Sequence, residues 1–276
     1  MNRLKAMPQE TFPKESCLFV PIDGEVDSTW RYLSEKLSED KRQKMIAQQV
    51  AWGMDTMIFL TYGRGGDCEI NPFIQTYGPD VDFPKVARWM QRLKPGKHGA
   101  NLIPCLFCDD DPETASNIGF ANYYTPAACQ VLSPYSKAIC AGLEMNEQYN
   151  TFKRSLSPAA KAEHIKRYRD SMTRIIKICH DNTDKPILVH MQWDMISPLP
   201  AGLDGLILEH PWPPQDGDKH SADEAASIGA VAIERAGQYG VSVGFNEYHI
   251  KPWSVRGREM TRALAKLPCF MIGGPV

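Results

Sequence analysis

The sequence predicts an α/β fold: a (β/α)8 TIM barrel with a short or missing fifth helix and no eighth helix. Eight short apolar runs recur along the chain, helical patterns lie between them, and each run ends in polar or aromatic residues. Near-continuous apolar runs are typical of parallel strands that are buried on both faces. Their alternation with helices indicates a closed parallel barrel. We expect a single domain over residues 1–276, a usual length for one such barrel.

The expected strands, taken in order, share an apolar start and a polar end. They are CLFVPID (17–23), TMIFLTYG (56–63), NLIPCLFCDD (101–110), AICAGLEMNE (138–147), PILVHMQW (186–193), GLILEHPW (205–212), VSVGFNEYHI (241–250) and CFMIGGP (269–275). An open doubly wound sheet is the main alternative. No glycine-rich phosphate loop follows the first run, which argues against a nucleotide-binding version of that fold.

The clearest helix is predicted over 157–180, where Ser157 can cap and Pro158 suits the first turn. Its apolar stripe consists of Ile165, Tyr168, Met172, Ile175, Ile176 and Cys179. Ser221 and Glu224 form a possible capping box ahead of a helix to about Ala236. Weaker helical patterns cover 39–52, 83–94 and 255–266.

Three segments fit the barrel pattern less well. Only SPLPAGLD (197–204) separates the fifth and sixth strand endings, which is too short for a full helix, and we expect no helix after the eighth strand. Segment 1–16 is a candidate to cover that gap. Residues 111–136 are weakly patterned, and we interpret them as a substrate-side loop.

Composition narrows the classes of partner. The net charge of -2 provides no overall basic field for nucleic acid or an anionic membrane. The first residues lack the apolar core of a signal peptide, and no run approaches a membrane span, so we expect a cytoplasmic protein. The eight cysteines are expected to be free thiols. Cys105 and Cys108 form a lone CxxC without the second pair that a zinc site needs.

Carboxylates and aromatic rings dominate the ends of the predicted strands, where a barrel carries its active site. Aromatic faces pack on the C–H surfaces of a sugar, while carboxylates bind its hydroxyl groups and act on the glycosidic oxygen. The sequence therefore favours a saccharide ligand. Asn246 is one of the polar strand ends but receives no role. Besides Glu147 and Glu247, the candidate residues are Tyr62, Arg64, Asp109, Glu144, Asn146, His190, Gln192, Trp193, Glu209, His210, Trp212 and Tyr248.

The fourth run ends in Asn146-Glu147, and the seventh ends in Glu247-Tyr248. In this order and placement the chain resembles the retaining glycoside hydrolases of clan A, the "4/7" barrels. The resemblance implies that Glu147 is the acid/base and Glu247 the nucleophile. It also implies that Asn146 binds the hydroxyl beside the reacting carbon and that Arg64 keeps Glu247 ionised. The chain departs from the family at the eighth strand, where Gly273-Gly274-Pro275 stands in place of a frequent tryptophan.

Elementary chemistry supports the same pair of residues. A retaining glycosidase needs two carboxyl groups about 5–5.5 Å apart, one of them ionised and the other protonated. A neighbouring carboxylate in a partly desolvated cleft raises the pKa of the proton donor. Glu144 is an alternative acid, because it shares strand parity with Asn146.

Two other functions stay open at this point. One is a non-catalytic barrel that binds carbohydrate, and the other is a metal-dependent hydrolase built on His190 and His210. The first run has no H-x-H and the eighth no Asp, so most ligands of such a metal site are lacking. We expect no metal and no cofactor, and an oligosaccharide or polysaccharide as the partner, with the oligomeric state undetermined.

Overall fold

The structure is a computed structural model of the whole chain. It describes residues 15–17, 54–60, 101–107, 118–143, 157–192, 199–209, 220–246 and 254–273, with single residues of 38–47 and 84–91. Predictions that fall elsewhere, including those on residues 1–14 and on the CxxC residue Cys108, lie outside the described residues. Of the segment 1–16 expected to cover the gap after the eighth strand, Glu15 and Ser16 belong to a strand of the barrel.

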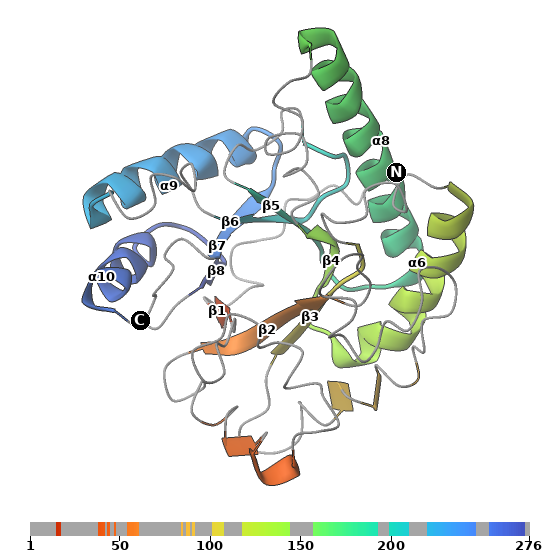
Figure 1. Cartoon of the computed structure of the whole chain (residues 1–276), viewed down its shortest axis with the longest axis horizontal. Coiled ribbons are helices and arrows are strands. Elements are labelled where there is room, and N and C mark those ends of the chain that lie inside the picture. Colours follow the sequence, from red (N-terminus) through yellow and green to blue (C-terminus); the bar gives the residue numbers. More distant parts are fainter. Residues whose placement is uncertain are drawn as a thin grey trace.

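Eight parallel strands close into a barrel in simple sequence order, and β8 pairs with β1 (Figure 1). The strands are β1 (Glu15–Cys17), β2 (Met54–Leu60), β3 (Asn101–Cys105), β4 (Ile139–Leu143), β5 (Ile187–Gln192), β6 (Gly205–Glu209), β7 (Ser242–Asn246) and β8 (Met271–Ile272). The predicted (β/α)8 barrel is thus confirmed.

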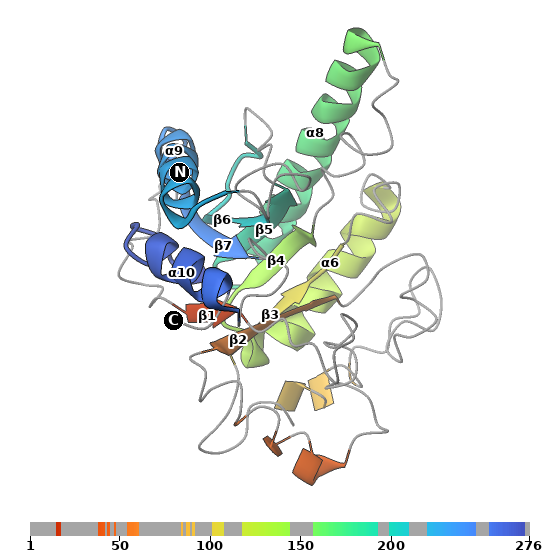
Figure 2. The same ribbon diagram turned by 60° about the vertical axis from the view of Figure 1, so that its left-hand side comes forward.

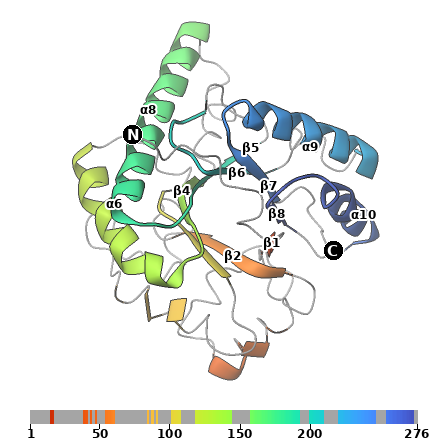
Figure 3. The ribbon, with the colours of Figure 1, turned by 180° about the vertical axis from the view of Figure 1, so that it is seen from behind.

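Helices cover the outside of the barrel (Figure 2). They are α6 (Ile118–Leu132), the short 3-10 helix η1 (Ser133–Tyr135), α8 (Pro158–Asn182), α9 (Ala222–Gly237) and α10 (Val255–Leu264). Seen from behind, α6 and α8 lie together on one side and α9 and α10 on the other, and each pair is in contact (Figure 3). The described residues of 39–52 and 84–91 are also helical.

Local sequence signals account for α8 and α9. The Ser157 side chain accepts a hydrogen bond from the Ala160 backbone N–H, and the predicted stripe from Tyr168 to Cys179 is buried. Ser221 and Glu224 form the predicted capping box of α9. These caps occupy N–H groups that have no partner within the helix, so they set where each helix begins.

The segment between β5 and β6 contains no helix in its described part, residues 199–204. This agrees with the predicted short or missing fifth helix. Residues 201 and 202 form a turn in which Gly202 adopts a φ of 81°. Gly273 is the last described residue, so the expectation about an eighth helix is not tested.

The interpretation of 111–136 as a loop is wrong for its described part. Residues 118–132 form α6, whose buried face includes Ala121, Tyr124, Ala128 and Leu132. Tyr124 makes an edge contact with Phe107 at a ring-centroid distance of 5.3 Å. Pro126 inside the helix weakens its sequence signal because proline removes a helical hydrogen bond, but tertiary packing stabilises the helix nonetheless.

Apolar side chains form two cores. The larger core lies between the strands and the helices and includes Val189, Leu208 and Phe245. The smaller core fills the barrel with inward-facing strand residues and with Ala138 and Phe270, which directly precede β4 and β8. It consists of Ile103, Cys105, Ala138, Cys140, Leu188, Ile207, Phe270 and Met271. This two-layer arrangement follows from the period of two along a strand.

The ring of Phe270 occupies the barrel interior near its amino-terminal end. A Cβ atom on Gly205 would lie 2.7 Å from Leu188 Cδ2 and 3.0 Å from Phe270 Cε1. One on Gly244 would lie 2.9 Å from Met271 Cβ and 3.1 Å from the Phe270 ring. The two glycines therefore make room for the phenylalanine, which closes the floor of the barrel.

Cys105, Cys129, Cys140, Cys179 and Cys269 are buried thiols outside any disulfide, as predicted for these five. A hydrogen bond with Cys129 and burial raise the pKa of the Cys179 thiol well above its ordinary value. Among the described helices, none is both long and apolar enough to cross a bilayer.

Candidate active site

The carboxyl-terminal ends of all eight strands lie at one rim of the barrel, because every neighbouring pair is parallel. At this rim β4 ends at Leu143, β5 at Gln192, β6 at Glu209 and β7 at Asn246. Glu247 follows Asn246 directly in the sequence. The rim is where barrels of this type carry their active sites.

A buried pair of polar side chains joins β5 to β7 inside the barrel. His190 Nε2 lies 3.2 Å from Asn246 Nδ2, across the strand β6 that separates their strands. The exposed fraction is 0% for His190 and 1% for Asn246. Two buried polar groups in an apolar barrel are costly unless they bond to each other, so this contact compensates for their burial.

The orientation of the Asn246 amide assigns the hydrogen-bonding roles in this contact. With Nδ2 facing His190, the amide donates and His190 Nε2 accepts, which corresponds to the tautomer with its proton on Nδ1. A metal ion bound through Nε2 would need the lone pair that this bond uses. Within the described part of the chain, no three His, Cys, Asp or Glu residues lie together as metal ligands would.

Strand register places two more candidate residues beside this pair. Gln192 of β5 pairs with Glu209 of β6, and Glu209 pairs with Asn246 of β7. The three residues form one row across the sheet at its carboxyl-terminal edge. The polar ends of three adjacent strands are therefore level, as a site assembled from several strands requires.

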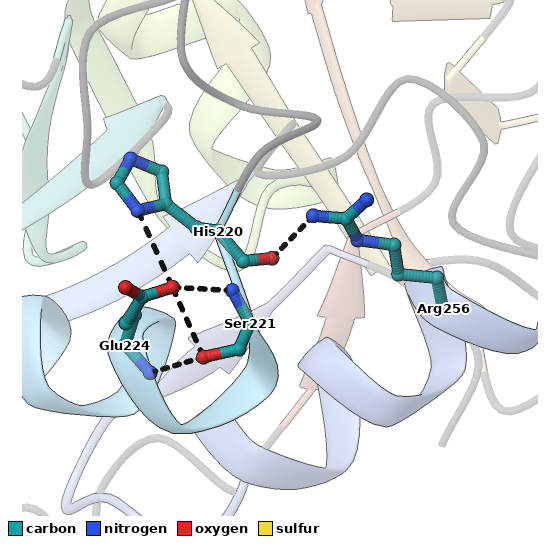
Figure 4. A network of polar contacts seen from close by, with 4 residues as sticks. All are labelled: His220, Ser221, Glu224 and Arg256. Carbon is teal, nitrogen blue, oxygen red and sulfur yellow. Dashed lines mark hydrogen bonds and ion pairs between the residues drawn. The ribbon is translucent and has the colours of Figure 1, made fainter.

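The amino-terminal ends of α9 and α10 are tied together next to this rim (Figure 4). Arg256 Nη2 donates to the His220 carbonyl at 2.5 Å, and His220 Nδ1 lies 3.8 Å from Glu224 Oε2. The Ser221 backbone N–H and hydroxyl both donate to that carboxylate and lower the pKa of Glu224. These contacts hold the residues that follow the loop after β6 against the helix that follows the loop after β7.

Most residues that the sequence nominated lie outside the described residues. They are Tyr62, Arg64, Asp109, Glu144, Asn146, Glu147, Trp193, His210, Trp212, Glu247 and Tyr248. The backbones of Gln192 and Glu209 are placed at the rim, and His190 is the nominated residue whose side chain is described. Their roles stay predictions.

Sequence reasoning gave no role to Asn246, although it counted this residue among the polar strand ends. A signal was present in the run VSVGFNE. Val243 and Phe245 face the helix layer, so alternation places Gly244 and Asn246 on the inward face. An amide on the inward face of an apolar strand, next to Glu247, indicates a residue of the site rather than of the core.

Comparison with known proteins gives no match to a family model and none to a curated protein. Solved structures do resemble the fold. The beta-glycosidase from the hyperthermophile Thermosphaera aggregans has a TM-score of 0.57 at 10% identity, covering 96% of this chain and 87% of that one. Beta-glucosidase 1317 has a TM-score of 0.58 at 9% identity, with coverage of 95% and 87%.

A third likeness is to the GH113 beta-mannanase AaManA from Alicyclobacillus acidocaldarius in complex with ManMIm. Its TM-score is 0.51 at 13% identity, and the match covers 95% of this chain and 85% of that one. Identities this low show the shared fold and not the activity. The chain therefore shares its barrel fold with these solved glycosidases, and the resemblance predicted from its strand ends is confirmed at the level of the fold.

Proposed function

We propose that the protein is a retaining glycoside hydrolase that cleaves a β-linked or related saccharide with Glu247 as nucleophile and Glu147 as acid/base. The observation that carries the proposal is the order of the closed barrel. It brings the ends of β4 and β7 to one rim, directly before the two segments that contain these glutamates. The glycosidase folds of the similar structures support it.

In the first step the Glu247 carboxylate forms a bond to the anomeric carbon while the glycosidic C–O bond breaks. The leaving oxygen takes the proton of Glu147, which becomes a carboxylate. In the second step Glu147 removes a proton from water, the resulting oxygen attacks the anomeric carbon, and Glu247 leaves as a carboxylate. Two inversions give net retention of configuration.

The register of β4 bears on the choice between Glu144 and Glu147. Cys140 pairs with Leu188 and Leu143 with His190, so β4 has one residue more than β5 over this stretch. This bulge breaks the alternation of faces. Counting from the inward-facing Cys140 therefore no longer assigns Glu144 to a face. Glu144 still shares the parity of Asn146, so the dependence of activity on the leaving group decides between the two acids.

The test uses a panel of aryl β-glycosides with the purified full chain. Glu247→Gln should abolish turnover of every glycoside that the wild type cleaves, because no covalent intermediate can form. Glu234→Gln is the matched control, since Glu234 is an exposed glutamate on α9. Full activity of Glu247→Gln, with the same substrate and enzyme concentration as the wild type, would exclude Glu247 as the nucleophile.

A non-catalytic carbohydrate-binding barrel is the alternative that these measurements separate from the enzyme. It predicts that the wild type binds a saccharide by calorimetry yet releases no aglycone from any member of the panel. The rim geometry is compatible with binding, but the presence of both glutamates in the sequence favours turnover.

A further inference from the structure

We infer that His190 is a positioning residue, which fixes Asn246 and through it sets the position of the proposed nucleophile Glu247. This inference deepens the proposed function and rests on it. It departs from the expectation that His190 binds substrate directly.

The position of the pair within the barrel supports this role. Below it the interior is filled by Leu188, Ile207 and the Phe270 ring, so His190 and Asn246 form the polar boundary between the apolar filling and the rim. Asn246 is the last residue of β7, and its backbone pairs with Glu209 of β6. Its side chain is held at 3.2 Å by a residue of β5. Both the backbone and the side chain of Asn246, the residue before Glu247, are therefore anchored.

His190 is itself held rigidly. Its backbone pairs with Leu143 of β4 on one side and Ile207 of β6 on the other. It is fully buried, and an imidazole has few rotamers in such a setting. A rigid acceptor on β5 can therefore define where the end of β7 lies.

Preorganisation of the nucleophile explains why such a pair would be kept. A nucleophile must be held within about 0.5 Å of its productive position, and a displacement of about 1 Å can cost about 100-fold in rate. The pair costs burial of two polar groups, which two apolar residues would avoid. Its benefit is a fixed direction for the chain at the point where β7 ends.

The first experiment compares His190→Leu with His190→Gln on a cleaved aryl glycoside. Leucine removes the acceptor, whereas the glutamine carbonyl oxygen can still accept from Asn246 Nδ2. We expect kcat of His190→Leu to fall about 100-fold while KM changes less than about threefold. His190→Gln should stay within about tenfold of the wild type, because it keeps the hydrogen bond. A raised KM with unchanged kcat would overturn the inference and show that His190 binds substrate.

The second experiment separates positioning from stability. His190→Leu leaves the Asn246 amide buried without this partner, so its melting temperature should drop. Adding Asn246→Leu removes both polar groups and should recover most of the melting temperature, since paired replacement is nearly neutral. The kcat should stay low in the double variant. Recovery of kcat together with stability would show that the pair is merely structural.

The third experiment does not depend on activity. The nitrogen-15 shifts of His190, assigned by comparison with His190→Gln, should show a neutral ring protonated at Nδ1. A ring protonated at Nε2 would overturn the acceptor role assigned to His190 toward Asn246 Nδ2, on which the comparison with His190→Gln rests. If Glu247→Gln keeps full activity, the proposed function and the positioning role fail together. If Glu247→Gln is inactive but His190→Leu keeps the wild-type kcat, only the positioning role fails.

Discussion

The amino-terminal end of the barrel and its carboxyl-terminal rim use polar side chains in different ways. At the amino-terminal end, Asp204 accepts from the Ile187 backbone N–H at 2.7 Å, and His180 Nε2 lies 2.8 Å from the Gly202 carbonyl oxygen. These side chains complete the hydrogen bonding of a turn. At the rim, the buried contact joins two side chains, His190 and Asn246, from strands that are not neighbours.

The difference assigns a role in stability alone to the amino-terminal end and a role in both stability and function to the rim. A side chain that bonds to backbone replaces a partner that the turn lacks, so its loss affects folding. The His190–Asn246 contact joins one side chain to another, and an apolar pair would fill the same space at lower cost. We therefore expect substitutions at the amino-terminal end to change the free energy of unfolding. Substitutions at the rim should change turnover.

The largest effect is expected at the proposed acid. Glu147→Ala should lower kcat/KM for glycosides with poor leaving groups by about 10²- to 10⁴-fold, because the leaving oxygen is no longer protonated. An activated aryl glycoside should lose far less in its first step, since its phenolate leaves without a proton. Glu144→Ala should affect the two substrate types equally. If instead Glu144→Ala shows the dependence on leaving group, the acid role belongs to Glu144.

The next effect is on stability at the amino-terminal end. Burial raises the pKa of Asp204 above its ordinary value, partly opposed by its bond to the Ile187 N–H. Because the pKa of Asp204 is raised in the folded state, its contribution to the free energy of unfolding is fully present below the unfolded pKa of about 3.9. This contribution is lost as pH rises through the folded pKa. Asp204→Asn keeps an acceptor without the charge. Its stability relative to the wild type should therefore improve as pH rises from about 4 upward.

Urea unfolding of Asp204→Asn and Asp204→Ala at several pH values measures this. Asp204→Ala removes the acceptor and should cost about 1–3 kcal/mol at neutral pH. Turnover per folded molecule should stay at the wild-type level in both variants. If either Asp204 variant loses as much kcat as His190→Leu, the amino-terminal end and the rim do not differ in their effect on turnover.

The smallest effect is expected at the cap of α9, which lies beside the rim but serves the backbone. Ser221→Ala should cost about 1 kcal/mol, because the Glu224 N–H loses its acceptor. Because the pKa of Glu224 is lowered in the folded state, the stabilising contribution of its carboxylate is present above the unfolded pKa. This contribution is lost as pH falls through the folded pKa. Thermal melts at neutral and acidic pH should show a smaller Ser221→Ala deficit in acid, with Glu234→Gln unchanged. If Ser221→Ala loses the same stability at every pH, the Glu224 carboxylate does not contribute to the cap.

Much of the fold could be predicted because its signals are local. The caps at Ser157 and Ser221 and the stripe of α8 depend on residues three or four positions apart. Helix α6 was missed because Pro126 and the exposed Tyr123 interrupt its pattern, and its stability comes from packing on α8.

The candidate site was less predictable because it depends on register between distant strands. Sequence reasoning nominated His190 as a residue at a strand end, whereas the structure places it within β5, before the terminal Gln192. Its contact with Asn246 joins residues 56 positions apart and requires the barrel to close with β6 between them. The bulge of β4 between Cys140 and Leu143 has no sequence signature in ICAGL. It alters which later residues share a face of the sheet with Cys140.

The most direct test of the two-glutamate account is the configuration of the products formed with azide. In Glu247→Ala, azide should attack the substrate itself and give a glycosyl azide of the opposite anomeric configuration. In Glu147→Ala, azide should attack the intermediate on Glu247 and give a glycosyl azide with the configuration of the substrate. Proton NMR of the two products on one activated glycoside measures this. Opposite anomers from the two variants are the predicted result. The same anomer from both, or no azide product from either while the wild type is active, would contradict the account.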